Sequence, residues 1–252
     1  MIPATLALLD AIVAVLLVAG GILAAHFGLV LPFSGFRFFM VGFFLSLLGI
    51  LVGLLGIVRT GAPERHAGRT RAIAGLVVCA LIALPVVGII VHTHDRPLMN
   101  DVTTDFQEPP SLAHAATLPA NKGRNMTYDA TRNEKLQREA YPAIKPLVLK
   151  LKPDQCFVIA REAAARMRGW RVTSEDPHAL SFEGVATSCL FRFKDDFAVE
   201  VRPGPQGGCV VEMRSKSRVG KGDFGANARR IEAFLGRVDR MAASAPAPAP
   251  KT

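Results

Sequence analysis

The residues best suited to chemistry lie between positions 214 and 231, where basic, hydroxyl and amide side chains alternate with glycines. Glycines at 220, 222 and 225 let the backbone turn tightly before a predicted helix, and Asp223 is placed to cap that helix. Free N–H groups at a helix N-terminus favour anions. The stretch is therefore a candidate site for an anion or an acidic partner. Its members are Arg214, Ser217, Arg218, Lys221, Asp223, Asn227 and Arg230.

A structural interpretation of the same stretch stays open. A loop that is capped by Asp223, and in which Arg218 pairs with Asp223 or a neighbouring acid, would have the same residues. Such a loop needs no ligand, because its charges are satisfied inside the domain.

Carboxylates offer a second chemistry. Asp195, Asp196 and Asp223 are candidates for general acid and base work in a hydrolase or transferase with a basic anion clamp. Asp195-Asp196, however, falls in a predicted tight turn, where Asp is common. The sequence has no nucleophile elbow, phosphate loop, HExxH or CxxC motif. The preferred interpretation is a binding module without catalysis, metal or cofactor, and the hydrolase or transferase is the alternative.

The elements that carry these residues follow a membrane region. Three apolar runs, at about 6–31, 38–58 and 72–91, each reach the roughly 20 residues that a bilayer core requires. No Lys or Arg precedes the first run and Asp10 lies inside it, which disfavours a cleaved signal peptide. Residues 1–91 are thus predicted to form three transmembrane helices. A channel or transporter is disfavoured, because the runs lack polar pathway residues.

Orientation follows from the short loops. Residues 59–71 hold four arginines against one glutamate, whereas the preceding loop has only Arg37. Short cytoplasmic loops carry the excess of Lys and Arg. The N-terminus is therefore predicted to be cytoplasmic, and the region after residue 91 to be periplasmic, in a bacterial inner membrane.

The net charge of +9 at pH 7 limits the partners. A basic domain can bind nucleic acid, but an external location argues against that. It favours anionic lipid headgroups of the bilayer, an anionic envelope component or an acidic protein. The oligomeric state is not predicted.

The external region is expected to be an α+β domain. Residues 92–140 are rich in turn formers and predict an extended linker, residues 141–243 the domain, and residues 244–252 a flexible Ala/Pro-rich tail. Alternating apolar positions in 185–193, 197–202 and 209–214 predict neighbouring antiparallel strands with one charged face. The whole is an antiparallel sheet of about five strands with two helices on one face.

Cys156, Cys189 and Cys209 are expected to be buried free thiols. In a simple meander the strands of Cys189 and Cys209 are separated by another strand, about 9–10 Å in all. A disulfide needs Cα atoms within about 7 Å.

Several short motifs extend beyond the glycine-rich stretch. They are 100–105 (NDVTTD), Tyr141-Pro142, Gly169-Trp170, 193–196 (FKDD), and above all Arg214-x-x-Ser217-Arg218-x-Gly220-x-x-Asp223-x-Gly225-x-Asn227-x-x-Arg230-Ile231. Over residues 98–241 the chain resembles the domain-of-unknown-function family numbered 1499. The resemblance implies a bacterial domain that often follows a membrane segment or lipid anchor, and it implies no activity.

Overall fold

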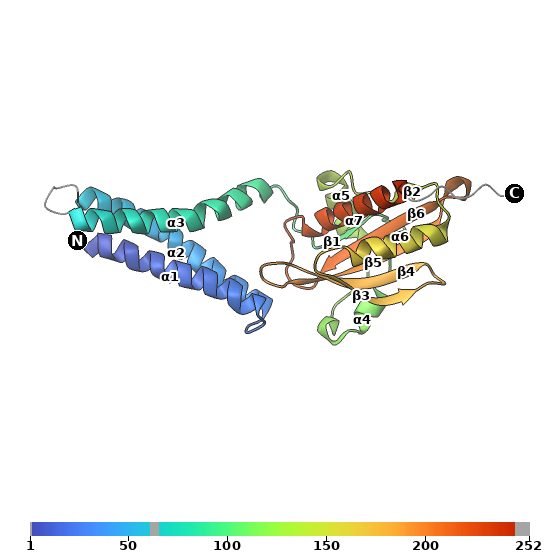
Figure 1. Cartoon of the computed structure of the whole chain (residues 1–252), viewed down its shortest axis with the longest axis horizontal. Helices are drawn as coiled ribbons and strands as arrows, with labels where there is room; N and C mark the ends of the chain where they lie inside the picture. The colour runs from blue at the N-terminus through green and yellow to red at the C-terminus, as the bar shows by residue number, and fades with distance from the viewer. Residues whose placement is uncertain (1, 61–65, 245–252) are drawn as a thin grey trace. The chain divides into compact units, whose positions relative to one another are not determined.

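The computed structural model describes residues 2–60 and 66–244 (Figure 1). The chain divides into two compact units. The first consists of Met1–Asp95 and Cys189–Phe193, and the second of Arg96–Ser188 and the chain from Lys194 onward. Residues 61–65 of the predicted cytoplasmic loop and 245–252 of the predicted tail lie outside the described residues.

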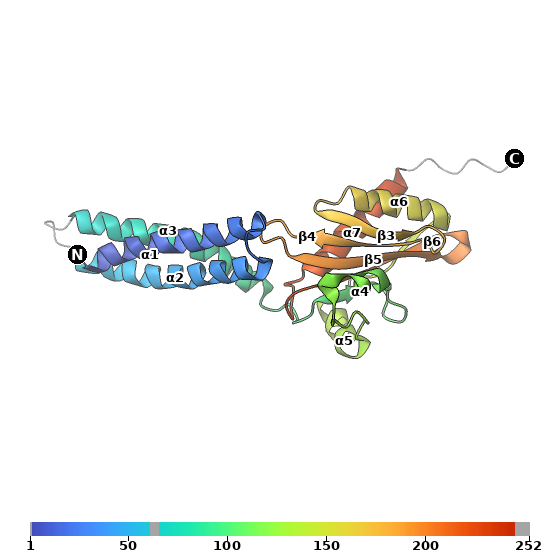
Figure 2. The ribbon, with the colours of Figure 1, turned by 90° about the horizontal axis from the view of Figure 1, so that it is seen from below.

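The first unit contains three long apolar helices, α1 (Ile2–His26), α2 (Pro32–Arg59) and α3 (His66–Thr93) (Figure 2). All three are long and apolar enough to cross a membrane, as predicted. Glycines bring their backbones together. A Cβ at Gly49 would collide with Cys79 of α3, and one at Gly53 would lie 3.0 Å from Leu76. The GxxxG spacing on α2 therefore serves packing within the chain.

The second unit is built on a six-stranded antiparallel sheet. Its strands are β1 (Asp101–Thr103), β2 (Leu147–Leu149), β3 (Trp170–Asp176), β4 (Ser181–Thr187), β5 (Lys194–Pro203) and β6 (Cys209–Ser217). The order is β1-β6-β5-β4-β3, and β2 pairs with another part of β6. The α+β class and the approximate strand count are confirmed.

Helices α6 (Pro153–Ala165) and α7 (Ala226–Ala243) pack on one face of the sheet, as predicted (Figure 1). Alternate residues of β5 and β6 enter the core beneath them, among them Phe197, Val199 and Met213. Trp170, the single tryptophan, is partly buried and packs against this core, with its ring centre 4.2 Å from that of Phe197.

The opposite, charged face of the sheet is covered. The range 92–140, expected to be a linker, contains β1, α4 (Ala113–Thr117), the short 3-10 helix η2 (Pro119–Asn121) and α5 (Ala130–Ala140). Gln137 of α5 holds β1 by accepting from the Thr103 N–H (3.1 Å) and donating to its carbonyl (2.6 Å). These partners are distant in sequence, so the segment has little periodicity of its own.

The strand predicted at 185–193 ends earlier. β4 stops at Thr187 and β5 begins at Lys194, so Asp195 and Asp196 lie in a strand rather than in a turn. Arg192 has φ of 61°, which interrupts extended backbone. Cys189 is consequently exposed in the connecting loop rather than buried.

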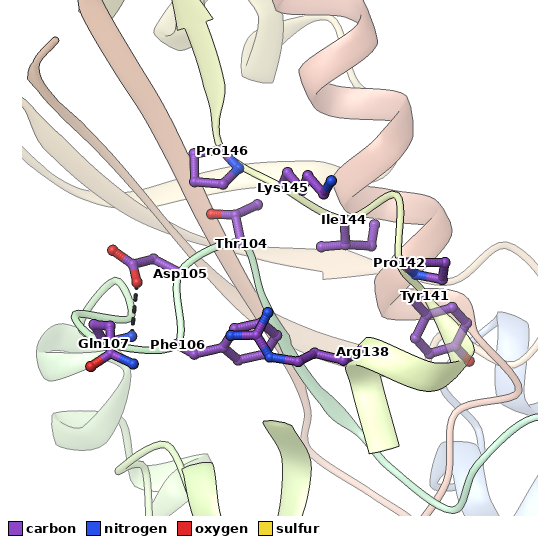
Figure 3. A pocket seen from close by; sticks show the side chains of 10 residues that line it. All are labelled: Thr104, Asp105, Phe106, Gln107, Arg138, Tyr141, Pro142, Ile144, Lys145 and Pro146. Carbon is purple, nitrogen blue, oxygen red and sulfur yellow. Dashed lines mark hydrogen bonds between the residues drawn. The ribbon is translucent and has the colours of Figure 1, made fainter. Parts of the chain in front are cut away.

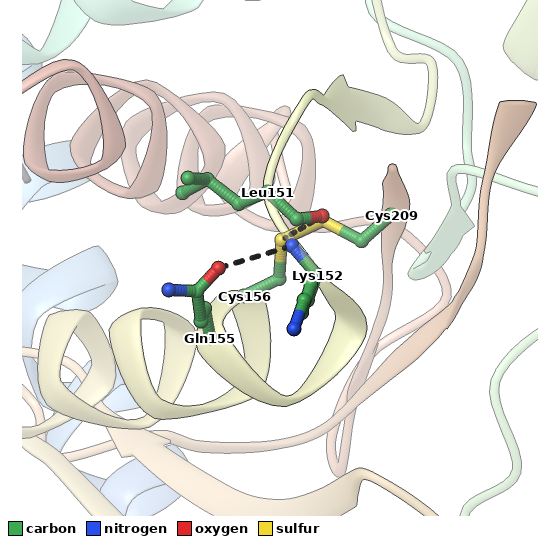
Figure 4. The surroundings of a disulfide bond; sticks show 5 residues. All are labelled: Leu151, Lys152, Gln155, Cys156 and Cys209. Carbon is green, nitrogen blue, oxygen red and sulfur yellow. Dashed lines mark hydrogen bonds between the residues drawn. A yellow bond between two sulfur atoms is a disulfide. The ribbon is translucent and has the colours of Figure 1, made fainter. Parts of the chain in front are cut away.

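The prediction of three free external thiols is wrong for two of them. Cys156 and Cys209 form a disulfide, with Cα atoms 6.6 Å apart (Figure 4). Cys209 faces the side of the sheet that α6 covers, and Cys156 lies in the first turn of α6. The spacing between strands does not limit this approach of a helix to a strand, so the two Cα atoms come within disulfide range. Cys189 and Cys209 are not joined, as expected.

The disulfide closes a loop of 53 residues, which predicts a contribution of about 4 kcal/mol to the stability of the second unit. Replacing Cys156 and Cys209 together by Ala should lower the free energy of unfolding by about that amount. Urea titration of the full chain, followed by Trp170 fluorescence, measures this unit specifically. Cys189→Ala is the control and should leave the midpoint unchanged. An equal loss in both variants would contradict the assignment.

Candidate anion-binding site

The predicted site residues lie at the end of β6, in the loop that follows, and in the first turns of α7. Because successive residues of a strand point to opposite faces, they divide into two groups. Ser217 faces α7, together with Ser215. Arg214 faces the covered side, together with Lys216.

On the α7 side, Asn227 is fully buried and joins three segments. Its side chain accepts from Ser215 Oγ (2.7 Å) and donates to Ser217 Oγ (2.9 Å) and the Asn100 carbonyl (3.1 Å). Arg230 forms an ion pair with Asp195 and donates to Ser215 Oγ (2.9 Å). These polar groups are satisfied within the domain.

On the covered side, Arg214 donates to both carboxylate oxygens of Asp101 (2.9 and 2.8 Å) and to the Met126 carbonyl (2.8 Å). Lys216 contacts the same carboxylate at 2.7 Å. The Arg214 and Asp101 side chains are 3% and 2% exposed. This is a bidentate pair with almost no access to water, the geometry in which a guanidinium holds a carboxylate most strongly.

Asp196 is another buried carboxylate of this face. Arg218 Nε donates to it at 3.0 Å, and Asn121 Nδ2 donates at 2.9 Å. Arg124 completes the group by donating to Asn121 Oδ1 (2.8 Å) and to the Ser217 carbonyl (2.6 Å). Hydrogen bonds from Asn121 and Arg124 therefore join η2 and the residues after it to the sheet.

The N-terminus of α7 is already capped. The Asp223 carboxylate accepts from the N–H groups of Gly225 and Asn227, both at 2.8 Å. An anion at this helix end would compete with Asp223 for the same donors. Lys221 is exposed in the preceding loop, and the described residues include no acid paired with it.

Charges on the covered side do not balance locally. Four cations form what we call the basic cluster: Arg124, Arg214, Lys216 and Arg218. They share two carboxylates, Asp101 and Asp196. The neighbouring Glu183 carboxylate accepts from the N–H groups of His114 and Ala115, at 2.7 and 2.8 Å, and when it is counted the four cations still outnumber the carboxylates by one. A local surplus of positive charge favours a bound anion.

A cavity of about 420 Å³ borders the basic cluster. Arg124 and Arg214 line it together with Tyr128, and none of the described residues around it is acidic. The Arg214 guanidinium carbon lies 5.4 Å from the centre of the Tyr128 ring. Burial, assisted by the charge of Asp101, raises the pKa of the Tyr128 phenol, so the group stays a neutral donor. Burial also lowers the pKa of Arg124.

Arg124 and Tyr128 were not among the predicted site residues, because both fall in the expected linker. No motif distinguishes them. The approach of η2 and the following residues to β6 is a long-range contact, and it alone brings them to the cluster.

A second cavity, of about 570 Å³, opens where β1 and β2 leave a gap along β6 (Figure 3). Two of the family-like motifs meet there, through Thr104-Asp105 and Tyr141-Pro142. Arg138 covers the Phe106 ring at 4.4 Å, and Asp105 accepts from the Gln107 N–H at 2.8 Å. Its polar lining mixes both signs of charge.

Near this cavity, in contrast to the basic cluster, acidic side chains outnumber basic ones. Arg202 lies within ion-pair reach of four carboxylates: Asp105, Glu108, Glu200 and Glu212, at 3.9, 2.5, 3.0 and 3.2 Å. Burial raises the pKa of Glu212 to about 7, against the attraction of Arg202 and assisted by the negative charges of Asp105 and Glu200. The charged face is thus basic at one end and acidic at the other.

The acids considered for catalysis do not converge. Asp195 and Asp196 are consecutive strand residues and point to opposite faces, where they pair with Arg230 and Arg218. Asp223 is bound to backbone N–H groups. These three carboxylates therefore do not form a pair that could act on one substrate.

The raised pKa of Glu212 predicts that the stability of the second unit depends on pH. Between about pH 4.5 and 7 the folded domain keeps a proton that the unfolded chain has lost, so stability falls as pH rises through this window. Glu212→Gln removes the titration. Its free energy of unfolding relative to the natural protein should rise by about 3 kcal/mol from pH 4.5 to 8. Trp170 fluorescence in urea measures it, and Glu139→Gln is the exposed control. A flat difference for Glu212→Gln would contradict the prediction.

The comparisons with known proteins concern the second unit. No curated protein matches the chain. A family model described as "Protein of unknown function (DUF1499)" matches residues 101–238, from the first residue of β1 to within the last turns of α7. This range contains Asp101, Asp196 and all four cations of the basic cluster. Since the match covers more than half of the sequence, the chain belongs to the DUF1499 family.

Proposed function

We propose that this membrane protein is a non-enzymatic binding module, and that its second unit recognises an anionic ligand or an acidic segment of a partner. The observation that carries the proposal is the basic cluster, in which four cations share two buried carboxylates beside a cavity. A bound anion would offset the surplus charge in a poorly solvated place, where the interaction is stronger than in water.

The site proposed is the cavity beside Arg124 and Arg214, rather than the N-terminus of α7. Arg214 belongs to the predicted set and lines the cavity. Arg124 has hydrogen bonds to an amide and a carbonyl rather than a carboxylate partner of its own. Tyr128 adds a neutral phenol, whose oxygen is buried without a hydrogen-bond partner among the described residues.

The alternative is a hydrolase or transferase that uses Asp195, Asp196 or Asp223. It is less well supported, because each of these carboxylates has partners inside the domain and they do not face one cavity. A non-catalytic role needs only the charge surplus and the cavity.

We propose further that the second unit is periplasmic, in a bacterial inner membrane, with the N-terminus of the chain in the cytoplasm. The arginines at 59, 65, 69 and 71 support this orientation. The disulfide between Cys156 and Cys209 adds independent support, because structural disulfides persist in oxidising compartments.

Binding is tested with inorganic phosphate as the probe. In nanodiscs of neutral lipid and at constant ionic strength, phosphate should raise the urea midpoint of Trp170 fluorescence in a saturable way. Arg124→Gln should remove the saturable part, and Lys122→Gln, the same change of charge at an exposed neighbour, should retain it. Phosphate also stabilises proteins by exclusion. An equal, non-saturating response in all three proteins would therefore contradict the proposal.

The orientation is tested by reporter fusions. Alkaline phosphatase fused after Thr252 should be active, because it folds only when exported, and a fluorescent cytoplasmic reporter at the same position should be dark. The reverse pattern would place the second unit in the cytoplasm.

A further inference from the structure

The loop between β4 and β5 is unusually apolar for a solvent-exposed turn. Residues 189–193 read Cys-Leu-Phe-Arg-Phe, and they group with the three apolar helices as part of the first unit. Leu190 is 56% exposed. Leu190 lies beside two phenylalanines, and exposed apolar patches mark protein or membrane interaction sites.

The loop packs against an aromatic row on α2. Phe33, Phe36 and Phe39 follow one another at helical spacing, with neighbouring ring centres 6.4 and 6.2 Å apart. The Phe191 ring meets those of Phe36 and Phe39 edge to face, at 5.5 and 5.4 Å. Edge-to-face pairs of this kind stabilise a contact beyond the burial of apolar area.

Two more contacts extend the loop's attachment. The ring centres of Phe193 and Phe36 are 6.1 Å apart. At the end of α1, His26 Nδ1 lies 3.0 Å from the carbonyl oxygen of Cys189. The loop thus touches the end of one candidate membrane span and the beginning of the next.

The surroundings of this contact have the character of a membrane interface. Phe27, Leu29 and Leu31, in the turn between α1 and α2, are all more than 70% exposed. The Arg37 guanidinium lies 4.7 Å from the centre of the Phe33 ring. Apolar side chains that enter the lipid beside a cation that reaches the headgroups are typical of the ends of membrane helices.

From these contacts we propose that the loop Cys189–Phe193 is an interfacial membrane element. It lies in the outer lipid interface against the aromatic row of α2, with Leu190 among the acyl chains and Arg192 towards the headgroup phosphates. This inference does not depend on anion binding by the second unit. The loop is proposed to contact the bilayer and α2 of the same chain.

Insertion is tested in the full chain in nanodiscs, with Cys79→Ala leaving Cys189 as the free thiol. An environment-sensitive fluorophore on Cys189 should emit at shorter wavelength and be quenched by lipids spin-labelled near the headgroup. The control carries the same label at His178→Cys, in the exposed turn between β3 and β4, with Cys189→Ala. Equal, weak quenching at both positions would overturn the proposal.

The contact with the helices is tested separately. In the Cys79→Ala background, His26→Cys should form a disulfide with Cys189 under mild oxidation, and Val58→Cys, at the other end of α2, should not. Failure of the His26→Cys cross-link would overturn the proposed position against the helices, as would equal cross-linking from both positions. Quenching with cross-linking at position 26 alone is the result that supports it.

Discussion

The second unit depends on one constraint: Asp101 and Asp196 are buried charges, at 2% and 0% exposure, and each must be paired. An unpaired buried carboxylate costs several kcal/mol. Arg214 and Lys216 of β6 pair with Asp101, and Arg218, the residue after β6, pairs with Asp196. Asn121 of η2 also donates to Asp196, and Arg124 donates to Asn121. Pairing therefore fixes which segments cover this side of the sheet.

The two faces of the sheet are held by different forces. The face under α6 and α7 is an apolar core with one disulfide, and it tolerates exchanges of similar volume. The other face is ionic, and each of its members has a specific partner. The ionic face does not neutralise itself: its basic end has surplus cations, and its acidic end has four carboxylates around Arg202. The proposed function follows from the basic end.

Much of the architecture was predictable from local patterns. The three membrane helices follow from length and composition, and the strands β5 and β6 from alternation, because their core-facing residues repeat every second position. Helix α7 follows from the spacing of Ile231, Phe234 and Val238. The 214–231 motif indicated the family. Its residues form the end of β6, the loop that follows and the first turns of α7.

What the sequence did not predict depends on contacts between distant segments. The structure of 92–140 comes from partners on β6 and β4. The disulfide comes from a helix crossing a strand. The loop that follows the early end of β4 contacts α2 through Phe191 and Phe193. Arg124 and Tyr128 entered the candidate site in the same way. None of these residues has a pattern within its own neighbourhood.

The most direct test of this account is amide hydrogen exchange in the full protein carrying Asp196→Asn. Removing one partner of a buried pair costs about 3–5 kcal/mol, and each 1.4 kcal/mol is a tenfold change. Residues 112–126, which Asp196 holds through Asn121, should exchange roughly a hundred to a few thousand times faster. The amides of α6 and α7 should keep their protection, and Asp239→Asn, at an exposed position of α7, should change neither region. Unchanged exchange in 112–126 would show that the covering segment does not depend on the buried carboxylate.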